Sequence, residues 1–192
     1  MDKSLAKIRH ERSKKDFPGL KLEEDEYVEF AFKRAKICLL MIWGCTLMGL
    51  ITALLAVLLV LIWQPSMDEM GSNFLFIILL ALVAVILISG AIASMIYHGN
   101  RLFITNKHAI QMIMTSPTSN SINIIDLSSI EDASFRQDGL LEKMFNYGTL
   151  RLSTVGDETT YTFKYSDIRG EDLKTITELI SDAKKKAKKA KD

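Results

Sequence analysis

Two long apolar runs, residues 37–63 and 74–97, dominate the pattern of hydrophobic and polar positions. Neither run contains Asp, Glu, Lys, Arg or His. A helix needs about 20 apolar residues to cross the roughly 30 Å hydrocarbon core of a bilayer, and both runs are longer than that. The first run starts only at residue 37, and it exceeds the roughly 7–15 apolar residues of a signal peptide. The pattern therefore predicts a transmembrane helical hairpin.

The charged residues around the runs give the hairpin an orientation. The connecting loop, residues 64–73, carries Asp68 and Glu69 but no Lys or Arg. Basic residues lie on the other side of both runs: Lys33, Arg34, Lys36, Arg101 and Lys107. By the positive-inside rule we expect an exported loop and two cytoplasmic termini.

After the second run the hydrophobic period changes to two, which is typical of strands. We expect an antiparallel meander of six strands near residues 101–105, 109–114, 122–126, 130–136, 149–155 and 160–165. An amphipathic helix with one apolar stripe then closes the chain: Leu173, Ile176, Leu179, Ile180 and Ala183. The predicted fold class is a membrane-anchored α+β protein in which this helix covers the sheet.

The region before the first run gives weaker signals. Residues 1–29 are expected to be loosely organised, with a break at Pro18-Gly19, and residues 27–36 to continue helically into the membrane helix. The predicted segments are an N-terminal cytoplasmic segment that is partly disordered (1–36), two spans (37–63 and 74–97) around the loop (64–73), a cytoplasmic domain (98–183) and a basic tail (184–192).

The net charge of +1 hides a strong segregation of charge. Residues 98–183 contain eight Lys/Arg and twelve Asp/Glu, whereas the tail has six lysines and one acid. The tail lysines are Lys184, Lys185, Lys186, Lys188, Lys189 and Lys191. Polybasic segments attract anionic lipid and RNA. Because the tail has no interleaved aromatic residues for base stacking, nucleic acid is disfavoured, and lipid contact or plain solvation is expected.

The sequence contains no constellation that indicates catalysis. Cys38 and Cys45 lie on one face of the first predicted span and cannot form a bridge within a regular helix. His10, His98 and His108 are scattered, so no metal-ligand spacing exists, and we expect His108 to be exposed in a hairpin turn. We also find no glycine-rich phosphate loop. The sequence therefore predicts a protein without enzymatic activity, cofactor or metal.

Small residues recur every fourth position in the two runs, which allows close helix approach in lipid. They are Cys45, Gly49 and Ala53 in the first run, and Ser89, Gly90, Ala93 and Ser94 in the second. Either packing within one hairpin or homo-oligomerisation would use them. No ionisable side chain lies inside either run, which disfavours a channel or transporter.

A short apolar stretch interrupts the predicted meander. It consists of Leu140, Leu141, Met144 and Phe145, which share one side of a helical turn. The favoured interpretation is a cap on the sheet core. The alternative is a loop that dips into a membrane or binds a partner.

Four segments resemble the bacterial pleckstrin-homology-like (PH-like) membrane proteins. They are LEEDEYVEFAFKRAK (22–36), NRLFITNKHAI (100–110), IIDLSSIEDAS (124–134) and DGLLEKMFNYGTLRL (138–152). Asp126 stands where that family often has Pro, and Glu142 where it often has Gly. The resemblance implies a partly open barrel with a helix across one end. It also implies a binding or scaffolding module in the bacterial cytoplasmic membrane.

The function expected is that of an integral membrane protein whose cytoplasmic PH-like domain serves protein binding, scaffolding or self-association. The alternative is a lipid or small-molecule sensor that uses the open end of the barrel. Inositol lipid is disfavoured, because the turn between the first two predicted strands holds only Lys107 and His108. Burial of Leu140, Met144 and Phe145 in the barrel would argue against the pocket.

Overall fold

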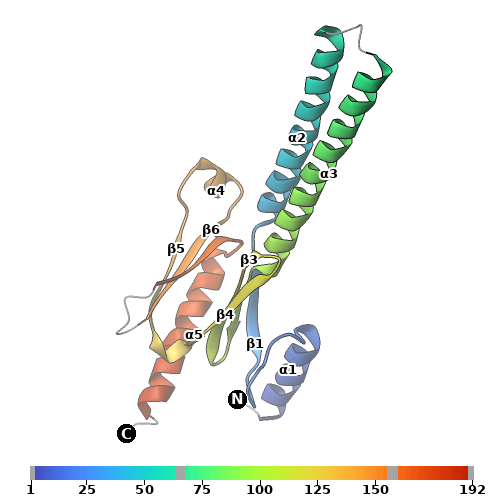
Figure 1. The fold of residues 1–192 in the computed structure, drawn as a ribbon. Coiled ribbons are helices and arrows are strands. Elements are labelled where there is room, and N and C mark those ends of the chain that lie inside the picture. The colour runs from blue at the N-terminus through green and yellow to red at the C-terminus, as the bar shows by residue number, and fades with distance from the viewer. Residues whose placement is uncertain (1–2, 64–67, 155–159, 190–192) are drawn as a thin grey trace. The chain divides into compact units, whose positions relative to one another are not determined.

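The fold combines a helical hairpin with two small antiparallel sheets (Figure 1). The computed structural model describes residues 3–63, 68–154 and 160–189. These residues fall into two compact units. The helical unit comprises Lys36–Tyr97 and residues 116–118, and the sheet-rich unit comprises the rest.

The helical unit consists of α2 (Lys36–Trp63) and α3 (Glu69–Gly99). Both predicted helices are present, although α3 begins five residues before the apolar run at residue 74. Among the described residues, these two helices are long and apolar enough to cross a membrane. Most of their large side chains are exposed in the isolated chain, including Leu58, Ile62 and Val85.

Small side chains let the two helices approach each other. A Cβ on Gly90 would lie 2.6 Å from Thr46 Oγ1, and one on Gly49 would contact Ile86 at 3.5 Å. Thr46 and Ala53 are the buried residues of α2, and the Thr46 hydroxyl donates to the Ile42 carbonyl oxygen at 2.9 Å. These contacts support the interpretation that the small residues pack the hairpin together.

The sheet-rich unit contains one four-stranded sheet and one three-stranded sheet. The first follows the order β1 (Val28–Lys33), β2 (Arg101–Thr105), β3 (His108–Ser116) and β4 (Ser119–Asp126). The second follows the order β5 (Ile130–Arg136), β6 (Gly148–Thr154) and β7 (Thr160–Ser166). The 3₁₀ turn η1 (Leu127–Ser129) connects the two sheets, and α4 (Leu140–Met144) connects β5 to β6. Strands are present at all six predicted positions, although residue 155, the predicted end of the fifth, lies outside the described residues. The predicted single meander is corrected, because the strands are divided between two sheets.

The seventh strand, β1, corrects the prediction that residues 27–36 are helical. β1 pairs antiparallel with β2, with Phe32 opposite Leu102 and Lys33 opposite Arg101. The alternation of apolar and charged residues in VEFAFK has the period of a strand, and aromatic residues favour strands. Phe32 is buried in the main core. The sheet therefore takes one strand from outside the predicted 98–183 domain.

Residues 3–27, the described residues before β1, are also ordered, in contrast to the loose organisation expected of residues 1–29. The helix α1 (Lys3–Asp16) ends just before the predicted break at Pro18-Gly19. Leu20 is then buried against Phe103 and Ile110, which belong to a second, smaller core. Phe17 lies edge-on to Phe103 with 5.1 Å between the ring centroids. These apolar contacts hold the N-terminal segment on the sheet.

The predicted C-terminal helix is confirmed as α5 (Gly170–Lys189), which lies against β5 and η1 (Figure 1). Ile176 and Ile180 are buried, and the other three stripe residues are half-buried at the edge of the same core. At the start of the helix the Arg169 amide donates to Asp172 Oδ2 at 2.9 Å. That contact places a negative charge at the positive end of the helix dipole.

Ile176→Ala should destabilise the sheet-rich unit by roughly 2–5 kcal/mol, because its side chain is fully buried in the core. That is a large part of the 5–15 kcal/mol or so that stabilises a typical domain. Pulse proteolysis in urea, on the full chain in detergent, would measure the change. Leu179→Ala should cost less, and the exposed Glu178→Ala almost nothing. Equal midpoints for the Ile176 and Glu178 variants would contradict this packing.

Candidate functional site

The apolar residues around α4 do not cap the sheet core. Leu140 is 88% exposed, Met144 68%, Leu141 50% and Phe145 46%. The favoured prediction for this stretch is therefore wrong, because the helix projects from the β5–β6 connection instead of folding under it. The core is filled without α4, by residues such as Leu150, Leu152 and Ile176. Burial of one Leu, Met or Phe side chain is worth about 1.5–3 kcal/mol, so this surface would gain from an apolar partner.

The backbone around α4 is held in one defined shape. The Gln137 side-chain amide donates to the carbonyl oxygens of Glu142 (3.3 Å) and Tyr147 (3.0 Å). The Tyr147 amide in turn donates to the Glu142 carbonyl oxygen at 3.0 Å. Gly139, at φ 143°, has a backbone that only glycine adopts readily. The apolar side chains are thus presented by an ordered loop.

The acidic side chains of this loop are used within the loop. Arg136 Nε donates to Asp138 Oδ1 at 2.6 Å. The Glu142 carboxylate accepts a hydrogen bond from the Asp138 amide. Both carboxylates therefore have local partners. The apolar side chains are thus the main exposed feature of the connection between β5 and β6.

α4 lies at the end of the three-stranded sheet to which the start of α2 is joined. Gly148, which begins β6, pairs with Ser166 at the end of β7. Ser166 also forms an isolated bridge with Arg34, and the Ala35 amide donates to the Tyr165 carbonyl oxygen at 2.6 Å. The next residue in the chain begins α2. The sequence predicts neither the bridge between Arg34 and Ser166 nor the end of the sheet at which α4 lies.

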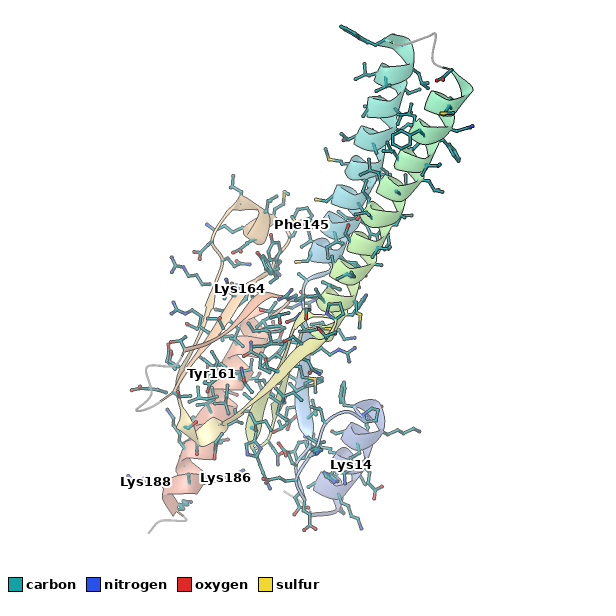
Figure 2. The ribbon with its side chains drawn as sticks, viewed as in Figure 1. Lys14, Phe145, Tyr161, Lys164, Lys186 and Lys188 are labelled. Carbon is teal, nitrogen blue, oxygen red and sulfur yellow. The ribbon has the colours of Figure 1, made fainter. Side chains whose placement is uncertain are left out.

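The predicted basic tail is a continuation of α5 as far as Lys189, and Lys191 lies outside the described residues. Lys184 Nζ donates to the Glu131 carbonyl oxygen at 3.3 Å, and Lys185 Nζ lies 3.5 Å from Asp182 Oδ1. Figure 2 shows Lys186 and Lys188 at one end of the sheet-rich unit and Phe145 at the other. The two candidate surfaces are therefore separate.

A shallow cleft of about 380 Å³ lies beside the tail, at the turn between β2 and β3. Lys107, His108 and Lys186 line it, together with the acids Glu23 and Asp126. Lys107 Nζ lies 3.0 Å from Glu23 Oε2. Since its cations are matched by carboxylates, the cleft has the mixed charge of a surface groove and lacks the excess of positive charge that a phosphate group requires.

A buried polar network that the sequence did not predict lies next to this cleft. Glu26 is buried, and its carboxylate accepts hydrogen bonds from the Thr105 hydroxyl (2.6 Å) and the Glu23 amide (2.9 Å). His108 Nδ1 lies 2.9 Å from the same carboxylate, so His108 is a half-buried partner and not the exposed turn residue expected. Within the acidic run EEDE nothing marks Glu26 as the buried member.

Two opposing effects act on the pKa of Glu26. Burial raises it, because a buried carboxylate loses its hydration. Hydrogen bonds from Thr105, the Glu23 amide and His108 lower it, and together they outweigh burial, so the pKa lies below its ordinary value of 4.5. The network joins the segment before β1 to the β2–β3 turn, and its position gives it a structural role.

The two sheets and the covering helix α5 are the features of a PH-like module. The chain joins this module to the two apolar helices α2 and α3. The family model for the bacterial PH domain matches residues 37–184, a range that includes both helices of the hairpin. The chain belongs to this bacterial PH domain family. The match begins after β1, so the first strand lies outside it.

Solved structures with PH domains are also similar to parts of the chain. One is a DUF1696 family protein with a pleckstrin-homology domain from Shewanella loihica PV-4. It is 17% identical, with a TM-score of 0.33 over 44% of this chain and 70% of that one. Another is the N-terminal PH domain of Vps36, 16% identical, with a TM-score of 0.30 over 48% of this chain and 66% of that one. Comparison with curated proteins gave no match.

Replacing Glu26 by Gln should destabilise the fold at neutral pH by roughly 1.5–3 kcal/mol, the range for a hydrogen bond to a charged group. Because the folded-state pKa is lowered, the carboxylate stabilises the fold above pH 4.5, and this contribution is lost as the pH falls through the folded-state pKa. Glu26→Gln should therefore lose stability at pH 7 and show a flatter dependence below pH 4.5.

Calorimetry of the full chain in detergent, at a series of pH values, would measure both effects. The matched control is Glu24→Gln, since the side chain of Glu24 is exposed. Parallel pH profiles for wild type and Glu26→Gln would contradict the assignment of this carboxylate as a stabilising group.

Proposed function

We propose that the chain is an integral membrane protein with two spans that holds its PH-like domain at the cytoplasmic face of a bacterial membrane as a non-enzymatic binding module. The observation that carries the proposal is the surface of α2 and α3. Large apolar side chains are exposed along both helices, and few residues of either are buried. Monomeric soluble proteins rarely expose contiguous apolar patches above a few hundred Å². A bilayer covers such a surface, and helices satisfy their own backbone within it.

The charge pattern supports the orientation. Lys33, Arg34 and Lys36 precede α2, and Arg101 follows α3. The loop between the helices has no Lys or Arg. Under the positive-inside rule this distribution directs both termini, and with them the PH-like domain, to the cytoplasm.

The filled core favours a surface partner over an internal ligand. Leu127, Ile130 and Ile176 are fully buried and fill the interior of the sheet-rich unit. Leu140, Met144 and Phe145 are exposed, so they do not plug the open end of the barrel, and the burial that would have argued against a pocket there is not observed. On the outside, β4 is an edge strand of the four-stranded sheet among the described residues. Its side chains Ile122 and Ile124 are 54% and 62% exposed. An exposed apolar edge strand is a template for strand addition by another chain.

A photo-crosslinking amino acid at Ile124 should therefore capture a protein in intact membranes, either a partner or a second copy of this chain. Immunoblotting and mass spectrometry of the adduct would identify it, and a second copy would give twice the mass of the chain. The same probe at the exposed Glu178 on α5 is the control. Equal crosslinking at both positions would indicate random collisions and remove β4 as the binding edge.

The topology can be tested by cysteine labelling in cells. In a background with Cys38→Ala and Cys45→Ala, a cysteine at Ser72 should react with an impermeant maleimide, because it lies at the loop end of α3. A cysteine at the exposed Ser181 on α5 should react only after the membrane is permeabilised. Labelling of Ser181→Cys in intact cells would reverse the orientation. Release of the whole chain by alkaline carbonate would show that it does not span the membrane.

A further inference from the structure

We propose that α4 and Phe145 form a third membrane contact, in which Leu140, Leu141, Met144 and Phe145 insert into the leaflet from which the hairpin emerges. This inference rests on the proposed function, because it requires the hairpin to lie in a bilayer. It adds a lipid-binding surface on the PH-like domain itself. In this arrangement the acyl and headgroup region of the bilayer covers the exposed apolar surface at α4.

The position of α4 in the sheet-rich unit supports this occupant. The pairing of Gly148 with Ser166, and the bridge from Ser166 to Arg34, place the start of β6 two strand positions from Arg34. At about 4.8 Å per strand this is roughly 10 Å. Phe145 precedes Gly148 by three residues, and Lys36, which begins α2, follows Arg34 by two. The α4 loop and the start of α2, where the chain would enter the membrane, are therefore both attached to the same end of the three-stranded sheet.

Side-chain contacts connect the same two places. The Arg34 guanidinium lies over the Tyr165 ring, with Cζ 6.0 Å from its centroid. The Tyr165 and Tyr147 ring centroids are 6.2 Å apart. Tyr147 in turn bonds the backbone of the α4 loop through Glu142. A basic side chain next to two tyrosine rings is the composition expected at a membrane–water interface.

The loop is also prepared for insertion. Its backbone is fixed by Gln137 and Tyr147, so entering the bilayer would require little further ordering, and little affinity would be lost to it. Asp138 and Glu142 are bound within the loop, so no unpartnered carboxylate has to enter the headgroup region. Lys143, which is exposed beside the apolar residues, has the charge that an anionic leaflet attracts.

Tethering decides between lipid and a protein partner for this surface. Two short links, 34–35 before α2 and residue 100 after α3, join the sheets to the helices. A bilayer holding those helices is therefore always within reach of this end of the domain, at high effective concentration. A soluble partner would have to compete with it. The basic end of α5 lies at the other end of the unit (Figure 2).

Site-specific fluorescence of the full chain in vesicles tests the inference. In the background lacking Cys38 and Cys45, single cysteines replace Leu140, Val85 and Ser181 and carry the environment-sensitive probe NBD. Each protein is reconstituted into phosphatidylcholine–phosphatidylglycerol vesicles with or without spin-labelled lipid. We expect a blue shift, and loss of emission with spin-labelled lipid, at Val85→Cys in α3 and at Leu140→Cys. Ser181→Cys should be quenched by aqueous iodide only.

The outcomes separate the inference from the proposed function. Lipid quenching at residue 85 but not at 140 would overturn the α4 contact and leave the hairpin in the membrane. Absence of lipid quenching at both positions would overturn both proposals. Protection of residue 140 from both lipid and iodide quenchers would mean that protein covers the loop, which also overturns the inference.

A second variant tests whether the natural side chains, and not the probe, drive insertion. Met144→Asp in the chain labelled at residue 140 should abolish lipid quenching there and leave quenching at residue 85 unchanged. Because Met144 is largely exposed, this change should not affect folding. Unchanged lipid quenching at residue 140 in this variant would overturn the role of the apolar surface.

Discussion

The pairing of β1 with β2 is the constraint on which the rest of the molecule depends. These neighbouring strands of one antiparallel sheet are separated in the chain by the whole helical hairpin. Lys33 lies opposite Arg101, so the chain leaves the sheet and returns to it at the same point. The hairpin is in effect a very long connection between two adjacent strands. Both of its ends are fixed by a ladder of backbone hydrogen bonds.

This arrangement explains why the residues before the hairpin are well ordered. Phe32 contributes to the main core, and the contacts of Leu20 and Phe17 with Phe103 continue from β1 onto the other face of β2. The buried Glu26 network joins the same segment to the β2–β3 turn. Removing the N-terminal segment would therefore expose one side of β2 and leave a buried strand at the edge of the sheet.

Much of the fold followed from hydrophobic periodicity. The strands after the hairpin, the α5 stripe and the two apolar helices have patterns that repeat over enough residues to be recognised. β1 was missed because six residues directly before a strongly helical run carry too little signal, although VEFAFK alternates as a strand does. The exposure of Leu140 and Met144 could not be predicted, because a helical turn of four apolar residues is equally compatible with a core cap. Two partners of Glu26, Thr105 and His108, are 79 and 82 residues away in the sequence, and only the fold brings them together.

The split between β1 and β2 has a consequence for the order of events during synthesis. Residues 34–100 separate the two strands, so β1 leaves the ribosome well before the partner that completes its hydrogen bonds. At about 5–20 residues per second, β1 waits for a time on the order of several seconds. Joining strands across so long a connection would normally be slow, because closing a long loop is entropically unfavourable. Once α2 and α3 have packed through Thr46 and Gly90, however, the two ends of the connection are brought together. Packing of the hairpin thus favours completion of the sheet, and until β2 is available β1 lacks the strand that pairs with it.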